Sequence, residues 1–135
     1  MNFIRNFPFA KICSLNIKET ASFYCELIDL EETKEIHSFI SRNNIPFLLL
    51  GEGTNIVPTE TYNGLVIQNQ LKGIELLDNN TIQVSSGENW HAFVEWTVKN
   101  KKYGLENLAL IPGTVGAGPI QNIGAYGSEI GNYIQ

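Results

Sequence analysis

Short apolar blocks separated by polar turns predict that strands and helices alternate along this chain. Residues 21–27 (ASFYCEL) predict a strand. Residues 29–32 (DLEE) have the D-x-x-E spacing of a capping box, and the apolar residues behind them recur at helical spacing until about residue 44. The run at 47–50 (FLLL) is typical of a strand buried on both faces. We therefore expect a β–α–β unit that leads into a glycine-containing loop at 51–55 (GEGTN).

The second half of the chain has a different pattern. Residues 64–71 predict another strand, and residues 74–85 predict a hairpin around the Asp-Asn-Asn turn at 78–80, because asparagine tolerates positive φ. A helix should begin after Asn89 as N-cap, with Gly104 in the left-handed position behind its end. The residues expected on its buried face are Trp90, Phe93, Val94, Thr97 and Val98.

The composition changes around residues 71–73, which predicts two lobes. The first, residues 1–71, is an α/β unit. The second, residues 72–135, is an α+β unit rich in hairpin and loop. Residues 131–135 (GNYIQ) resemble the opening of a strand, so we expect this chain to be a fragment of a longer protein.

Composition narrows the class of protein. Hydrophobic residues make up 43% of the chain and charged residues 17%, which is typical of a globular domain. Nine basic and fourteen acidic residues give a net charge of −5 without a basic run, so we expect no nucleic-acid partner. The longest apolar run, residues 45–50, is too short to cross a bilayer, and the N-terminus lacks the apolar core of a signal peptide. A cytoplasmic protein without a membrane partner is expected.

Cysteine and histidine spacing predicts neither a metal site nor a disulfide framework. Cys13 and Cys25 belong to no CxxC motif, and we expect two reduced, buried thiols. His37 and His91 lie far apart and are expected on the surface or on a helix face. No nucleophile–base pair or carboxylate pair stands out, which favours chemistry supplied by a cofactor.

Three glycine-rich segments are the candidate binding elements. The loop at 51–55 follows a strand, so its N–H groups could converge on a pyrophosphate; the alternative is a plain turn. The small residues of 112–119 leave room for a planar ring; the alternative is a tightly packed internal turn. In 121–127, two amides could bind a heterocycle and Tyr126 a substrate; alternatively the amides satisfy loop carbonyls and Tyr126 is core. Together the three segments favour a phosphate-bearing nucleotide cofactor.

The same segments carry a family resemblance. They are Leu50–Asn55 (LGEGTN), Gly87–Trp90 (GENW), Gly104–Gly113 (GLENLALIPG) and Gly116–Gly127 (GAGPIQNIGAYG). On these residues the chain resembles the UDP-N-acetylenolpyruvoylglucosamine reductases, also called UDP-N-acetylmuramate dehydrogenases. The resemblance extends from about Ile12 to the C-terminus.

The resemblance implies an α+β chain with the vanillyl-alcohol-oxidase/PCMH-type FAD-binding fold, in which FAD lies between two α/β lobes and the second lobe is truncated here. It also implies a flavoprotein of bacterial peptidoglycan synthesis. Such an oxidoreductase takes hydride from NADPH onto FAD and passes it to the enolpyruvyl ether of a UDP-sugar, giving UDP-N-acetylmuramate.

The resemblance also implies which residues bind. Tyr126 would face the substrate. The FAD-binding residues would be Gly51, Glu52, Gly53, Thr54, Asn55, Ile56, Ile111, Pro112, Gly113, Thr114, Gly116, Ala117, Gly118, Ile120, Gln121, Asn122, Gly124, Ala125 and Gly127.

Catalytic residues of the family are not expected in this chain. The family uses an arginine in a Tyr-Arg-Asp-Ser context, a serine proton donor and a late glutamate. Arg5 and Arg42 stand in other contexts, and Ser128 follows a different motif. The fragment alone should therefore be inactive.

Two other hypotheses remain open. One is an oxidase of the same FAD superfamily that attaches FAD covalently through His or Cys near the pyrophosphate loop. No His or Cys lies between His37 and His91, which disfavours it. The other is a stand-alone nucleotide-binding module without catalytic activity.

Overall fold

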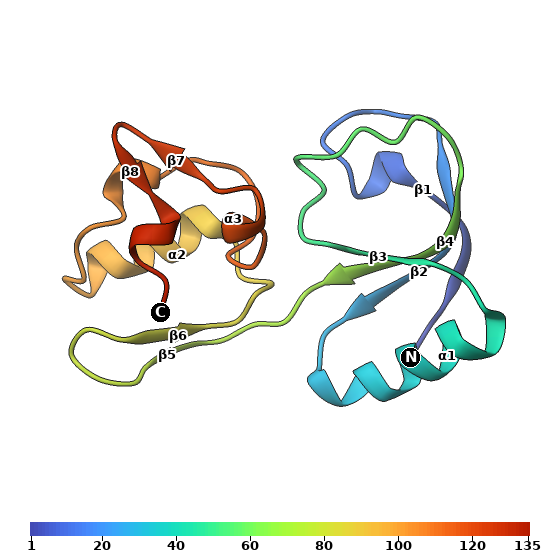
Figure 1. Cartoon of the computed structure of the whole chain (residues 1–135), viewed down its shortest axis with the longest axis horizontal. Helices are drawn as coiled ribbons and strands as arrows, with labels where there is room; N and C mark the ends of the chain where they lie inside the picture. The colour runs from blue at the N-terminus through green and yellow to red at the C-terminus, as the bar shows by residue number, and fades with distance from the viewer. The chain divides into compact units, whose positions relative to one another are not determined.

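The computed structural model describes residues 1–135 and divides them into two compact units, Met1–Leu71 and Lys72–Gln135, which we call unit 1 and unit 2 (Figure 1). Unit 1 contains β1 (Ile4–Pro8), β2 (Thr20–Leu27), α1 (Thr33–Asn43), β3 (Phe47–Leu50) and β4 (Tyr62–Asn69). Unit 2 contains β5 (Ile74–Leu76), β6 (Ile82–Val84), α2 (Trp90–Lys99), α3 (Ala117–Ile120), β7 (Gly124–Ala125) and β8 (Ser128–Glu129). None of the helices combines the length and the hydrophobicity that crossing a bilayer requires.

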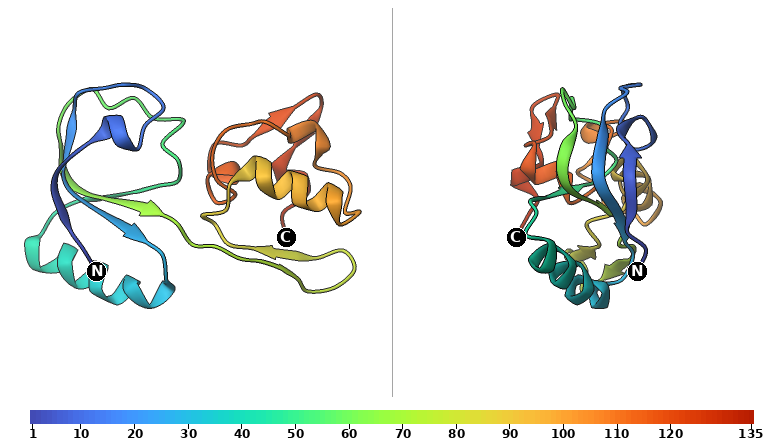
Figure 2. Two further views of the ribbon diagram at one scale, coloured as in Figure 1. Left: turned by 180° about the vertical axis from the view of Figure 1, so that it is seen from behind. Right: turned by 90° about the vertical axis from the view of Figure 1, so that its right-hand side faces the viewer.

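Unit 1 is built on a four-stranded sheet in the order β1-β2-β4-β3 (Figures 1 and 2). Strands β2, β4 and β3 run parallel, and β1 pairs antiparallel with β2 at one edge. Helix α1 connects β2 to β3 and packs on one face of the sheet through Ile36, Phe39 and Ile40. The other face is covered by Phe9, Ile12 and part of the loop that follows β3. The sheet core therefore lies between the helix and these loops.

Strand β3 corrects one expectation. It was expected to be buried on both faces, yet Phe47 is 58% exposed and Leu49 is 53% exposed. The reason is that β3 is the edge strand of the sheet, so only its other side chains, Leu48 and Leu50, pack into a core. The strand predicted at 64–71 runs two residues earlier, at Tyr62–Asn69.

The predicted capping box is confirmed. The Asp29 side chain accepts a hydrogen bond from the N–H of Glu31, and Glu32 Oε2 accepts from the N–H groups of Ile28 (2.9 Å) and Asp29 (3.1 Å). A single 3₁₀ turn at Leu30–Glu32 then continues as α1. These bonds satisfy main-chain donors that the start of a helix otherwise leaves unpaired.

The capping box makes the stability of unit 1 depend on pH. The hydrogen bonds from Ile28 and Asp29 hold the pKa of Glu32 below its ordinary value. The stabilisation is therefore present above the ordinary glutamate pKa and is lost as the pH falls through the lowered one. We expect the urea midpoint of the wild type to fall on acidification more than that of Glu32→Gln, whose amide oxygen accepts without titrating. Glu31→Gln, which removes no hydrogen bond, should follow the wild type; equal pH curves for all three would contradict the prediction.

Unit 2 opens with the predicted hairpin. Strands β5 and β6 pair antiparallel, and Asp78 accepts hydrogen bonds from the N–H groups of Asn80 and Thr81, both at 2.8 Å. Asn89 is the N-cap of α2, since its side chain accepts from the N–H of Ala92 at 2.9 Å. The hairpin and the start of the helix agree with the sequence pattern.

The C-terminal end of α2 differs from the prediction. The helix ends at Lys99, five residues before Gly104, and Lys101 takes the left-handed position with φ 59°. The N–H groups of Lys101 and Lys102 donate to the carbonyls of Val98 and Thr97, the pattern of a Schellman motif. Val98, expected on the buried face, lies within the helix but is 40% exposed.

The rest of unit 2 is irregular backbone around one core. That core comprises Trp90, Phe93, Val94, Leu108, Ile123 and Ile130. Strands β7 and β8 form a two-residue hairpin whose turn, Tyr126 and Gly127, has positive φ at both positions (51° and 81°). The strand expected at 131–135 is not formed, because the chain makes a 3₁₀ turn at Ile130–Asn132 instead.

Candidate cofactor site

The loop Gly51–Asn55 lies where the parallel strand β3 ends, which is where open α/β sheets bind ligands. Gly53 is buried, with φ +64°. A Cβ at this residue would lie 1.9 Å from the carbonyl oxygen of Ile12, and the Gly53 carbonyl accepts from the N–H of Ser14 at 3.4 Å. The loop therefore rests directly on the neighbouring main chain, and only glycine fits there.

This loop offers unpaired donors. The N–H groups of Gly53, Thr54 and Asn55 donate to no acceptor within the chain, and the side chains of Thr54 and Asn55 form no hydrogen bond either. Consecutive N–H groups in a tight loop suit an anion that needs many donors. The residues present thus fit a pyrophosphate. Ile56, the next predicted residue, lines a cavity of about 470 Å³ together with Phe9, Leu48 and residues 57–63.

A polar cluster beside the loop was missed by sequence reasoning. Gln68 on β4 donates from Nε2 to the carbonyl of Gly51 at 3.4 Å. The Tyr24 hydroxyl on β2 lies 2.5 Å from Gln68 Oε1 and 3.1 Å from Glu26 Oε1. Burial, with Glu26 adding to it, raises the pKa of Tyr24 above its ordinary value, so the hydroxyl stays protonated. The spacing of Tyr24 and Glu26, two residues apart on a strand, could have indicated a shared face.

The cysteines differ from each other. Cys25 is buried, and this burial, with the nearby Glu32 and Glu26, raises its pKa to about 12, so its thiol is protonated and inert at neutral pH. Cys13 is only half-buried, and its Sγ donates to the carbonyl of Ile56 at 3.5 Å. The fold therefore places one cysteine beside the glycine loop, although sequence spacing had indicated none there.

In unit 2, the glycine-rich run is held by the start of α2 and the residues before it. Four hydrogen bonds join these segments: Gly116 N–H to Ser86 O, Val115 N–H to Glu88 O and Trp90 N–H to Gly113 O, each at 2.9 Å, and Trp90 Nε1–H to Leu108 O at 2.7 Å. The motif GENW thus serves as the support of the run that follows Gly104.

Within residues 112–119, the glycines have two different roles. A Cβ on Gly116 would lie 2.5 Å from the Cβ of Ser86, and one on Gly118 would lie 3.3 Å from Ile123 Cδ1. These two glycines allow close internal packing. By contrast, the N–H groups of Gly113 and Thr114 donate to no acceptor within the chain, although both residues are buried.

Residues 121–127 present their polar groups outward. The side-chain amides of Gln121 and Asn122 form no hydrogen bond within the chain, and Tyr126 is 90% exposed at the tip of the β7–β8 hairpin. The alternative in which the amides satisfy loop carbonyls and Tyr126 is core is therefore wrong. Ile120, also in the predicted set, is 88% exposed. Surfaces of this kind are available for contact with a ligand.

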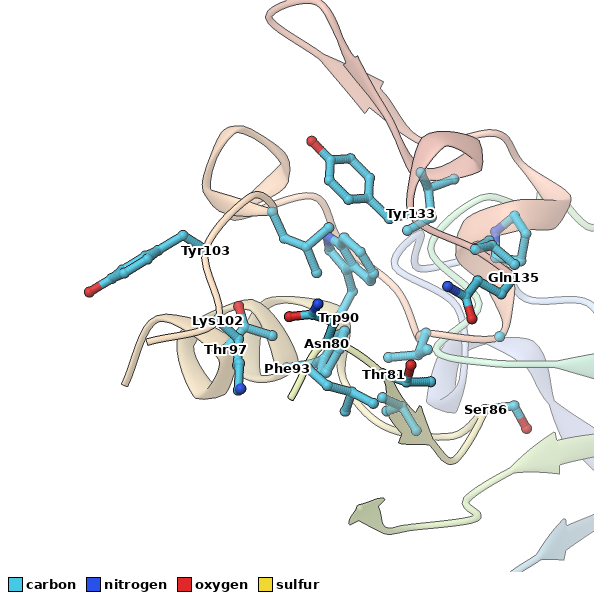
Figure 3. A pocket seen from close by; sticks show the side chains of 18 of the residues that line it. Asn80, Thr81, Ser86, Trp90, Phe93, Thr97, Lys102, Tyr103, Tyr133 and Gln135 are labelled. Carbon is cyan, nitrogen blue, oxygen red and sulfur yellow. The ribbon is translucent and has the colours of Figure 1, made fainter. Parts of the chain in front are cut away.

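A separate cavity of about 810 Å³ lies in unit 2 between α2, the β5–β6 hairpin and the last residues of the chain. Figure 3 shows Trp90 and Phe93 in the middle of its lining, whereas Tyr103 projects away. Of the predicted cofactor residues, only Gly116 lines it. The cavity is thus distinct from the surface that carries Gln121, Asn122 and Tyr126.

The sequence of this chain is similar to those of known proteins. The sequence profile described as FAD binding domain matches residues 21–135. The UDP-N-acetylenolpyruvoylglucosamine reductase of Buchnera aphidicola is 52% identical over 98 residues, covering 70% of this chain and 29% of that protein. The protein of the same name from Burkholderia orbicola is 39% identical over 137 residues, covering 98% of this chain and 39% of its own length.

A solved structure shares the fold. The UDP-N-acetylenolpyruvylglucosamine reductase of Thermus caldophilus matches with a TM-score of 0.69 at 23% sequence identity. The match covers 96% of this chain and 44% of that one. The chain therefore spans less than half the length of each of these relatives.

Proposed function

The chain belongs to the FAD binding domain family, and on that premise we propose that it is the N-terminal FAD-binding part of a UDP-N-acetylenolpyruvoylglucosamine reductase. The longer protein would be an NADPH-dependent cytoplasmic oxidoreductase. It would convert UDP-N-acetylglucosamine enolpyruvate to UDP-N-acetylmuramate for peptidoglycan synthesis. The observation that carries this proposal is the shared name of relatives 39% and 52% identical to the chain, which include one that covers 98% of it.

We further propose which residues hold the cofactor. In the proposed arrangement, residues 1–71 are the first lobe of the FAD-binding domain and residues 72–135 the start of the second. The free N–H groups of Gly53, Thr54 and Asn55 would bind the pyrophosphate. Residues 111–127 would line the rest of FAD, and Tyr126 would face the substrate. Bound FAD supplies the hydride-transfer chemistry, while the chain binds and orients it.

Catalytic residues would lie outside this chain. Its two arginines, Arg5 and Arg42, stand in unit 1 away from any Tyr-Arg-Asp-Ser context. The chain would therefore bind FAD without turning over the UDP-sugar. Full-length protein, in contrast, should purify with a flavin absorbance band that NADPH bleaches and the enolpyruvyl substrate restores.

Titration of FAD with the chain tests the proposed site. We expect saturable quenching of flavin fluorescence, and we expect Thr54→Val to weaken FAD binding by about ten- to a hundredfold, since a hydrogen bond to a charged group contributes about 1.5–3 kcal/mol. Thr59→Val, on an exposed threonine eight residues from Gly51, is the matched control and should bind as the wild type does. A folded chain that leaves flavin fluorescence unchanged would refute the assignment. Very tight binding would favour a stand-alone nucleotide-binding module.

One observation favours a second candidate, an oxidase with covalently attached FAD. Cys13 lies against Ile56, at the end of the glycine loop. Mass spectrometry of denatured full-length protein separates the two candidates. A chain of unmodified mass supports the reductase, whereas a retained flavin adduct on Cys13 would support the oxidase.

A further inference from the structure

Leu110 has an unusual main-chain conformation within the glycine-rich run. Its φ is +63°, in the left-handed region that residues with a Cβ seldom occupy, and its side chain is 77% exposed. An exposed side chain contributes little packing to hold a strained residue in place. The conformation must therefore be maintained through the main chain of Leu110 and its neighbours.

His91 supplies the contact at this residue. The Leu110 N–H donates to His91 Nδ1 at 3.3 Å. His91 lies in the first turn of α2, directly after Trp90, whose indole N–H binds the Leu108 carbonyl and whose main-chain N–H binds the Gly113 carbonyl. His91 is thus the middle of three attachments that fix this segment to the helix.

The hydrogen bond defines the state of the imidazole. Nδ1 can accept from Leu110 only when it carries no proton, so the ring is neutral and protonated at Nε2. Nε2 lies 3.7 Å from Glu95 Oε1, and the other oxygen of Glu95 lies 3.5 Å from Lys99 Nζ. The opposing segment, residues 108–113, has no titratable side chain. A second proton on His91 would therefore break the bond to Leu110 and strengthen the contact with Glu95.

We propose that His91 is a positioning residue: neutral His91 holds Leu110 in its left-handed conformation and thereby orients Ile111, Pro112 and Gly113 toward the cofactor. The orienting role rests on the proposed function, because these three residues belong to the proposed FAD wall. The hydrogen bond itself does not depend on that proposal. His91 touches neither FAD nor substrate in this role.

Two variants separate the acceptor from the ring. His91→Asn can place an amide oxygen near the position of Nδ1 and keeps an acceptor that does not titrate, whereas His91→Leu keeps the bulk and removes the acceptor. In NMR spectra of the chain, the Leu110 amide shift reports whether the acceptor at residue 91 is present. We expect this shift to stay near the wild-type value in His91→Asn and to be displaced in His91→Leu.

FAD affinity is the second readout. At neutral pH we expect His91→Leu to bind FAD about fivefold more weakly than the wild type, and His91→Asn to bind almost as well. His37→Leu, on the exposed histidine of α1, should change neither readout.

The outcomes distinguish this inference from the proposed function. A Leu110 amide shift that does not respond to His91→Leu overturns the hydrogen bond. A responsive amide combined with equal FAD affinity in the wild type and His91→Leu overturns the positioning role. If the Leu110 amide responds to His91→Leu but the wild-type chain binds no FAD, the hydrogen bond is supported. The proposed function and the orienting role are then both overturned.

Discussion

Gly53→Ala should destabilise unit 1 by about 2–5 kcal/mol and abolish FAD binding. A Cβ at this position would lie 1.9 Å from the Ile12 carbonyl oxygen and 2.9 Å from its carbon. Both atoms belong to the main chain, so the loop must move rather than a side chain. Overpacking of this kind costs about 1–3 kcal/mol, and a left-handed residue with a Cβ costs a further ~1–2 kcal/mol.

Urea unfolding and FAD titration measure the two effects of Gly53→Ala. Two control variants separate strain from collision. Gly127 has φ +81° with open space around its Cβ position, and Gly131 has open space without a positive φ. Gly127→Ala should cost only the strain, about 1–2 kcal/mol, and Gly131→Ala should be close to neutral. If Gly53→Ala loses no more stability in urea than Gly127→Ala does, the close approach to Ile12 does not constrain the loop.

The reason for the glycine at position 53 could be foreseen only in part. A strand followed by GEGTN indicates a turn whose main chain needs conformations that only glycine adopts easily, and the sequence is enough to predict this. The sequence does not reveal that Ile12, more than forty positions earlier, supplies the obstructing carbonyl. The same long-range packing brings Cys13 to Ile56. The sequence prediction that no cysteine lies near the glycine loop considered only residues close to the loop in sequence, and it therefore missed Cys13.

Sequence signals that span a few residues predicted the helices and strands themselves better than they predicted what packs around them. The Asp29–Glu32 capping box and the Asn89 N-cap were correct because each depends on residues within one turn. The burial of β3 was wrong because sheet order decides it, and FLLL reads the same at an edge as in the centre. The end of α2 was misplaced because Lys101 adopts the left-handed position that glycine usually takes.

In the candidate site, too, the sequence indicated the local feature but not its long-range partner. The glycines at 116 and 118 were recognised as positions of close approach, but the approach is to Ser86 and Ile123 of the protein itself. The N–H groups without an intrachain acceptor belong instead to the buried Gly113 and Thr114, which no composition pattern distinguishes from their neighbours. The hydrogen bonds of Gly113, Val115 and Gly116 to residues 86–90 explain why the GENW motif and the glycine-rich run occur together: each is the partner of the other's main chain.

Trp90→Ala should therefore have the largest effect in unit 2. Trp90 is 1% exposed, and its indole N–H donates to the Leu108 carbonyl at 2.7 Å. Removing a buried tryptophan costs about 3–5 kcal/mol, which is comparable with the whole stability of a unit of this size at about 0.05–0.15 kcal/mol per residue. We expect unit 2 to lose its cooperative urea transition and its FAD affinity.

Two further variants show what Trp90 contributes. Trp90→Phe retains most of the apolar volume but leaves the Leu108 carbonyl unpaired, so we expect a smaller loss of about 1–3 kcal/mol with weakened FAD binding. Trp96→Ala, on a half-buried tryptophan of the same helix, is the matched control and should leave unit 2 folded. A Trp90→Phe chain with wild-type stability and affinity would mean that volume alone supports the wall. Loss of both in Trp90→Phe would instead place the support in the hydrogen bond to Leu108.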